Sequence, residues 1–170
     1  MDSLKRIHTL VVMVENSPGV LTKVTSLFSR RGYNIISLIA SETEDTLISR
    51  LTIVVAGDDK VIEQVAKQLN KMVDVLKVTD ITQKETVGRQ LLLIKVAVET
   101  GTRVEIIELA NIFRSRILDI GRKSLIIEAT GDETKIKAMI DTFKPFGIIE
   151  LSRTGTISMV RGQKERQHKI

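Results

Sequence analysis

The sequence predicts an α+β fold built from two consecutive βαββαβ domains, each with an antiparallel sheet and both helices on one face. Two observations lead to this prediction. Strand-like and helix-like segments follow one another in the order strand, helix, strand, strand, helix, strand, which is the ferredoxin-like or split βαβ arrangement. The same order recurs in the second half of the 170-residue chain, and that length suits two small domains.

The first domain is expected to occupy residues 5–81. Residues 5–15 are rich in valine and alternate in hydrophobicity, which predicts a strand. A helix follows and ends at Gly32, with one apolar face formed by Val20, Leu21, Val24, Leu27 and Phe28. Two more strands are expected at residues 34–40 and 47–55, because the polar segment SETED between them is typical of a hairpin turn.

A second helix and a fourth strand complete this domain. The helix is expected to start at Gly57 and Asp58, because the apolar residues after them fall on one helical face. The strand is expected at residues 73–80. The polar segment TQKETVGRQ, residues 82–90, shows no periodicity and is expected to form a linker.

The second domain is expected at residues 91–162, with its elements in the same order as those of the first. The segment TGDETKI matches AGDDKVI of the first domain with one residue inserted, which supports a repeat. Its expected elements are a strand at 91–99, a helix at 103–114, strands around Ile117 and Leu125, a helix from Asp132 and a strand at 147–153. Residues 163–170 are basic and are expected to form a disordered tail.

The composition disfavours most catalytic chemistry. The chain has no cysteine, which excludes disulfides, thiolate catalysis and cysteine-ligated zinc. It has 2 histidines, at opposite ends of the sequence, so no histidine-based triad or acid-base pair is expected. His8 is expected to be a partly exposed strand residue, and the acidic residues lie where turns and helix starts favour them. We therefore expect neither a catalytic residue nor a metal site.

The same sequence features bear on location and on nucleic acid as a partner. The N-terminal residues lack the features of a signal peptide and no apolar stretch reaches membrane-spanning length, so a soluble, cytoplasmic protein without membrane contact is expected. The net charge of +5 is concentrated in the tail. Aromatic residues make up 3% of the chain, and no predicted strand carries the aromatic pair on which RNA bases stack. Nucleic acid is therefore not an expected partner.

The segment ENSPGVL, between the first strand and the first helix, is the candidate binding feature. With Ser17 as N-cap and Pro18 at the first helical position, the amides of Gly19 and Val20 would point outward. Such a helix start binds anions, and a small carboxylate would fit it. Asn16 adds a side-chain amide that can donate and accept. From these residues alone, a capped turn without a ligand is the simpler interpretation.

Three segments together resemble the ACT domain, a small ligand-binding module that regulates enzymes of amino-acid metabolism. They are NSPGVL at residues 16–21, FSRRGYN at 28–34 and SRLTI at 49–53. The segments GYNI and GDDKVIEQVAKQLNKMVDVLKV are more specific, and over residues 5–162 the chain is similar to the regulatory small subunits of acetolactate synthase, also called acetohydroxyacid synthase.

This resemblance implies a noncatalytic protein that activates a separate catalytic large subunit and confers feedback inhibition by a branched-chain amino acid, typically valine. The large subunit of such enzymes uses thiamine diphosphate, a divalent metal such as Mg²⁺ and FAD, so no cofactor is expected in this chain itself. The ACT domains of the family pair into homodimers, with the amino-acid effector between a loop of one chain and the helix-to-strand turn of the other. Carried over, the expected effector-binding residues are Asn16, Gly19, Val20 and Leu21 from one chain with Asn34 and Ile35 from its partner.

The second domain departs from this pattern. It has VETGTR in place of VENSPG and SRILD in place of RGYNI, so only the first domain is expected to bind effector. The second is then a dimerisation or subunit-contact surface, and the sequence leaves these two roles open. Two other functions are weighed against this one: a stand-alone ACT-type amino-acid sensor that regulates gene expression through the basic tail, and an independent enzyme.

Overall fold

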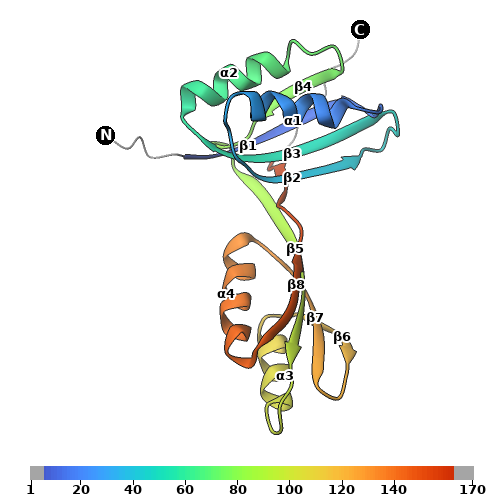
Figure 1. Ribbon diagram of the computed structural model, residues 1–170, viewed down its shortest axis with the longest axis vertical. Helices are drawn as coiled ribbons and strands as arrows, with labels where there is room; N and C mark the ends of the chain where they lie inside the picture. The colour runs from blue at the N-terminus through green and yellow to red at the C-terminus, as the bar shows by residue number, and fades with distance from the viewer. Residues whose placement is uncertain (1–5, 163–170) are drawn as a thin grey trace. The chain divides into compact units, whose positions relative to one another are not determined.

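The computed structural model describes residues 6–162, which form two compact units (Figure 1). Unit 1 comprises the described residues up to Val87 together with those from Ser158 onward, and unit 2 comprises Gly88–Ile157. The expected basic tail at 163–170 lies outside the described residues, as does the first residue of the expected domain.

Unit 1 has the predicted order of elements. They are β1 (Arg6–Glu15), α1 (Val20–Arg30), β2 (Ile35–Glu42), β3 (Ile48–Gly57), α2 (Asp59–Leu69) and β4 (Val75–Asp80). The strands form a 4-stranded sheet in the order β2-β3-β1-β4, and every pairing in it is antiparallel. Both helices lie on one face of this sheet (Figure 1). The βαββαβ prediction is therefore confirmed here.

The core of unit 1 follows from the alternation along its strands. Leu10 and Val12 of β1 pair with Ile53 and Leu51 of β3, and all of them point to the helix side and are buried. Phe28 on α1 is fully buried against them, as the helical periodicity predicts. Burial of each large apolar side chain contributes about 1.5 to 3 kcal/mol, so this shared core fixes the loops at both ends of α1.

Unit 2 repeats the arrangement. Its elements are β5 (Thr86–Ala97), α3 (Arg103–Ile112), β6 (Arg116–Ile120), β7 (Ser124–Gly131), α4 (Glu133–Phe143), a short 3₁₀ turn (Lys144–Phe146) and β8 (Ile148–Arg153). The main path of the sheet runs β6-β7-β5-β8, and both helices lie on one face (Figure 1). Phe143 fills the core beside Phe113 and Phe146, with ring centroids 6.4 Å apart in each pair.

The expected linker at 82–90 differs from the structure. Only its first residues form a turn, because β5 already begins at Thr86. Gln90 is buried, and its Nε2 donates to Thr156 Oγ1 at 2.8 Å, so a polar residue with a polar partner occupies an interior position. The sequence also did not predict β9 (Ile157–Val160), which pairs with β5. Hydrophobic periodicity reveals neither the burial of Gln90, because this residue is polar, nor β9, because this strand is short.

His8 is buried, with 4% of its surface exposed, and the expectation of a partly exposed residue was wrong. It lies on the helix side of β1, and its Nε2 is 3.3 Å from Oδ1 of Asp59 at the start of α2, without hydrogen-bond geometry. Alternation alone did not reveal this burial, because α2 covers the end of the strand.

Within residues 6–162, no helix combines the length and the apolar character that a bilayer crossing requires.

Candidate functional site

The turn before α1 is a type II β-turn, and this corrects the predicted cap. Gly19 has φ 86° and ψ −10°, close to the values of the third residue of such a turn, and Pro18 precedes it. The turn bond runs from Val20 N to the carbonyl oxygen of Ser17 at 3.4 Å. A positive φ at Gly19 is incompatible with a helix, so α1 begins at Val20 and its N-cap is Gly19, in place of Ser17.

The start of α1 leaves hydrogen-bond donors unused within the described chain. No side chain caps it and its first turn contains no acidic residue. The first helical bond joins Lys23 N to the Gly19 oxygen at 3.0 Å, and the amides of Gly19, Leu21 and Thr22 have no described acceptor. The Val20 amide, expected to be free, is occupied by the turn bond. The positive end of the helix dipole is therefore left without a counter-charge from its own turn.

Main-chain bonds hold this loop in place from two sides. Glu15 N donates to the Asp74 oxygen at 2.9 Å, and Asn16 N donates to the Leu47 oxygen at 2.7 Å. The Asn16 side chain adds a further bond, from Nδ2 to the Thr46 oxygen at 2.9 Å. The loop is thus fixed to the entries of β3 and β4.

The four predicted residues of this loop lie together, but they do not contribute in the same way. Asn16 and Gly19 are exposed. The Val20 side chain is 2% exposed and belongs to the core, so only its main chain faces the loop. Leu21 is 43% exposed, although its place on the predicted apolar face of the helix suggested burial. An exposed leucine beside free amides is an apolar surface that a small aliphatic ligand can cover.

The predicted residues Asn34 and Ile35 are not brought to this loop within one chain. They follow the C-terminal end of α1, whose 11 residues span about 16 Å at 1.5 Å per residue. Asn34 is exposed and Ile35 packs partly against the core. The two halves of the predicted site therefore lie at opposite ends of one helix and are not combined within one chain.

Glu42, which the sequence predicts only as part of a hairpin turn, also belongs to this region. It is the last residue of β2, and its Oε1 accepts from Asn16 Nδ2 at 3.0 Å. A carboxylate beside the loop adds a negative group that an ammonium can approach. The hairpin register places it there, and the register was not available from hydrophobic pattern alone.

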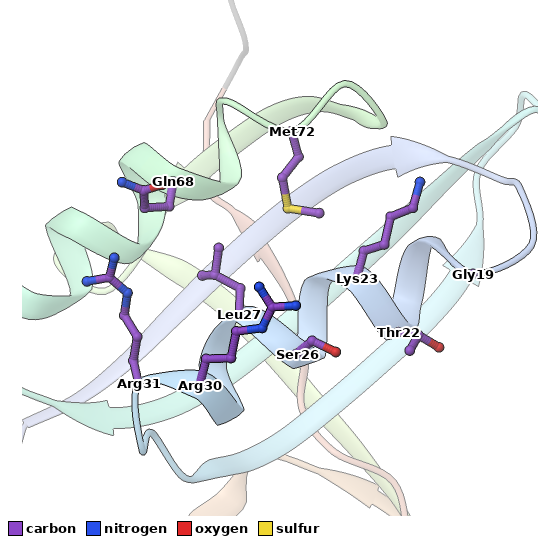
Figure 2. Close-up of a pocket in the computed structure, with 9 residues that line it drawn as sticks. All are labelled: Gly19, Thr22, Lys23, Ser26, Leu27, Arg30, Arg31, Gln68 and Met72. Carbon is purple, nitrogen blue, oxygen red and sulfur yellow. The ribbon is translucent and has the colours of Figure 1, made fainter.

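A groove of about 640 Å³ lies beside the start of α1, between α1 and α2, and Figure 2 shows the side chains around it. It contains the cations Lys23, Arg30 and Arg31. Lys23 Nζ is 2.6 Å from Oδ2 of Asp74, which ties α1 to the entry of β4. Gly19 belongs to this groove, whereas the other predicted effector residues lie outside it.

The corresponding turn of unit 2 has a different start. Gly101 has φ 92°, but the N-cap of α3 is Thr102, whose hydroxyl accepts from Glu99 N at 3.0 Å. Glu105 lies in the first turn of α3. Unlike the first turn of α1, that of α3 contains an acidic residue, whose negative charge makes this turn less suited to an anion than the turn at Gly19.

Among residues 6–162, no three histidine, cysteine or acidic side chains are grouped as a metal site would require.

Comparisons with known proteins show which family this chain belongs to. The family described as "AHAS small subunit-like ACT domain" matches residues 10–77, and "Small subunit of acetolactate synthase" matches residues 89–162. An Archaeoglobus fulgidus protein named "Probable acetolactate synthase small subunit" is 56% identical over 93% of this chain and 99% of its own length. The Mycobacterium leprae acetolactate synthase small subunit is 46% identical over 92% of this chain and 93% of its own length.

A solved structure agrees with these relatives. The crystal structure of the acetolactate synthase small subunit from Thermotoga maritima has a TM-score of 0.85 and 42% identity, covering 94% of this chain and 99% of that one. The similarity therefore includes both units and the loop before α1. The chain belongs to the family of acetolactate synthase small subunits, and its first unit carries the ACT domain.

Proposed function

We propose that this protein is the noncatalytic regulatory subunit of an acetolactate synthase in branched-chain amino-acid biosynthesis. It activates a catalytic large subunit and mediates feedback inhibition by valine or a related amino acid. The observation that carries the proposal is the start of α1 in a chain of this family. There, the segment from Asn16 to Leu21 carries unused amides, an exposed Asn16 side chain and the exposed Leu21.

Each part of an amino acid has a chemical match at this loop. The carboxylate accepts from the free amides of Gly19 and Leu21, an interaction worth about 0.3 to 1 kcal/mol and up to about 2 when partly buried. The ammonium donates to the Asn16 side-chain oxygen and to the nearby Glu42 carboxylate. The aliphatic side chain covers Leu21, and full burial of such a group is worth about 1.5 to 3 kcal/mol.

A homodimer completes the site in this proposal. Asn34 and Ile35 of a second copy supply the opposite wall, since the same residues of one chain lie at the far end of α1. Because both copies contact the effector, binding favours one arrangement of the dimer. A coupling of about 1 to 3 kcal/mol between effector binding and that arrangement is enough to lower the activity of a bound catalytic subunit.

The chemistry of the reaction is assigned to the partner. We expect thiamine diphosphate, Mg²⁺ and FAD to reside in the catalytic large subunit and no cofactor to reside in this chain. The names of the relatives support a large-subunit partner, because a small subunit is named as part of an enzyme.

Thermal unfolding of the isolated protein tests the effector site. Valine, leucine and isoleucine at millimolar concentration are added separately, with D-valine as the stereochemical control. A ligand that binds the folded state raises the melting temperature with its concentration, so at least one of the three L-amino acids should raise it more than D-valine does. Equal or absent shifts for all four compounds would count against an effector site.

A further inference from the structure

The face of the unit 1 sheet that points away from its helices carries a separate pocket. Side chains alternate along the strands, so Val11 and Arg50 face away from the helices, opposite to the buried Leu51. The described segment from Ser158 to Gly162 lies against this face. Arg50 Nη2 donates to the Ser158 carbonyl oxygen at 2.7 Å, and Ser158 is buried. The pocket lies between this segment and the sheet.

The pocket has a volume of about 310 Å³ and combines apolar walls with positive charge. Val11, Ile81 and Val160 give it apolar surface, and Thr79 adds a hydroxyl. Its charged lining residues, Arg50 and Arg161, are both cations. A ligand that fits such a lining has an anionic end and a short aliphatic body, and the volume is at the lower end of the range of about 300 to 1,000 Å³ typical of small-molecule sites.

Arg50 has donor capacity that the described chain does not use. Its Nε is buried and has no hydrogen-bond partner among the described residues. A guanidinium has five donors, and the bond to Ser158 uses only part of this capacity. Arg50 lines the pocket, so guanidinium donors that Ser158 does not use can bind a ligand there, and a carboxylate is the acceptor that a guanidinium binds best. The second cation, Arg161, is held loosely, since its Nε is 3.5 Å from the exposed Glu85 carboxylate.

We propose that this pocket binds a short aliphatic carboxylate, with the anionic end at Arg50 and Arg161 and the body against Val11 and Ile81. It is a second ligand site, because it shares no residue with the effector loop and does not require an ammonium. The ligand contacts both the sheet and the segment after Ser158, so its binding stabilises the packing of that segment on the sheet. This proposal is independent of the proposed regulatory function.

The test uses the full chain with ¹³C-labelled methyl groups and isovalerate as the probe. Isovalerate should shift the Ile81 and Val160 methyl signals with saturation in the millimolar range. Isovaleramide, which has the same shape without the charge, should leave them unchanged. Equal shifts with isovaleramide, no shifts with either compound, or isovalerate shifts confined to the Leu21 methyls would each overturn the proposal.

Two variants test whether Arg50 and Arg161 bind isovalerate. Arg50→Gln should weaken isovalerate binding at least tenfold. Because this change also removes the bond to Ser158, Arg161→Gln serves as a second variant. Its side chain is exposed, and its main-chain bond to Glu85 is retained, so the fold should persist while affinity falls several-fold. Arg31→Gln, on the helix side, is the matched control and should bind as the unmodified chain does. Unchanged affinity in Arg161→Gln would contradict the assignment.

Discussion

Asn16 and Glu42 are joined by a hydrogen bond from Nδ2 to Oε1 of 3.0 Å, which links the loop before α1 to the end of β2. With its Nδ2 also bonded to Thr46, the Asn16 side chain has a fixed orientation that leaves Oδ1 as an acceptor. The bond therefore holds two acceptors, an amide oxygen and a carboxylate, at the loop that leads into the start of α1. An amino acid requires this combination of donors and acceptors.

Replacing Glu42 with Gln should weaken effector binding about tenfold or more. The change removes the negative charge near the ammonium but keeps an oxygen that Asn16 can donate to. Hydrogen bonds to charged groups contribute about 1.5 to 3 kcal/mol, and about 1.4 kcal/mol corresponds to a factor of ten in affinity. Valine titration calorimetry measures the effect. Glu44→Gln, in the same hairpin, is the control and should leave the affinity unchanged.

Gly19→Asp should abolish effector binding, because a fixed carboxylate would compete for the same amides. A Cβ at this position meets no atom within 4 Å, so the new side chain has space, although φ 86° makes any substitution strained. Gly19→Asn is the matched control, since asparagine has nearly the same shape and tolerates a positive φ. Calorimetry should show no valine binding for the aspartate variant and measurable binding for the asparagine variant. Equal affinity for the two would contradict the role of the amides.

A mixed dimer tests whether the site includes two chains. Asn34→Ala alone should weaken valine binding, whereas Gly19→Asp alone should abolish it. In a heterodimer of the two variants, the loop of the Asn34→Ala chain meets the intact Asn34 of the Gly19→Asp chain, so one of the two sites is restored. Binding at half the normal stoichiometry is the expected result. If the site were contained in a single chain, the mixture would bind no better than its parent homodimers.

The sequence predicted the fold well because the core depends on periodic apolar residues. Leu10, Val12 and Phe28 follow the periods of a strand and a helix, and these periods are read directly from the sequence. The features that were missed depend on particular polar contacts. The burial of His8 requires α2 to cover a strand end, and β9 is a strand of 4 residues without a strong pattern.

Part of the candidate site was also predictable from the sequence. The Pro-Gly pair marked the turn before α1, but the choice between Ser17 and Gly19 as N-cap depends on the sign of φ at the glycine, which sequence does not fix. Glu42 reaches Asn16 through hairpin register, so a residue distant in sequence joins the loop only after folding. The assignment of the predicted residues to an effector stays a prediction that the variants above test.

The pair Glu63 and Lys67 on α2 should make stability weakly dependent on pH. Lys67 Nζ is 2.7 Å from Glu63 Oε1, and this bond and the positive charge lower the pKa of Glu63 below its usual value. A lowered folded-state pKa gives stability that is present above the unfolded pKa and lost as pH falls through the folded pKa. The effect should be small, because both side chains are about two-thirds exposed to solvent and screened by it.

A double-mutant cycle measures this contribution. Glu63→Gln, Lys67→Gln and the double variant are unfolded by urea at neutral pH and at a pH below the folded pKa of Glu63. A favourable coupling should be present at neutral pH and should vanish in acid. A coupling that persists in acid would show that the interaction does not depend on the charge of Glu63.

The rate of acetolactate formation by the cognate catalytic large subunit shows whether this chain both activates that subunit and makes it sensitive to valine. The rate is measured for the large subunit alone, with this chain, and with the Gly19→Asp variant, each in the absence and presence of valine. We expect the chain and the variant both to raise the rate, and valine to lower it only with the unmodified chain. No activation by the chain, or equal valine inhibition with the variant, would contradict the proposed function.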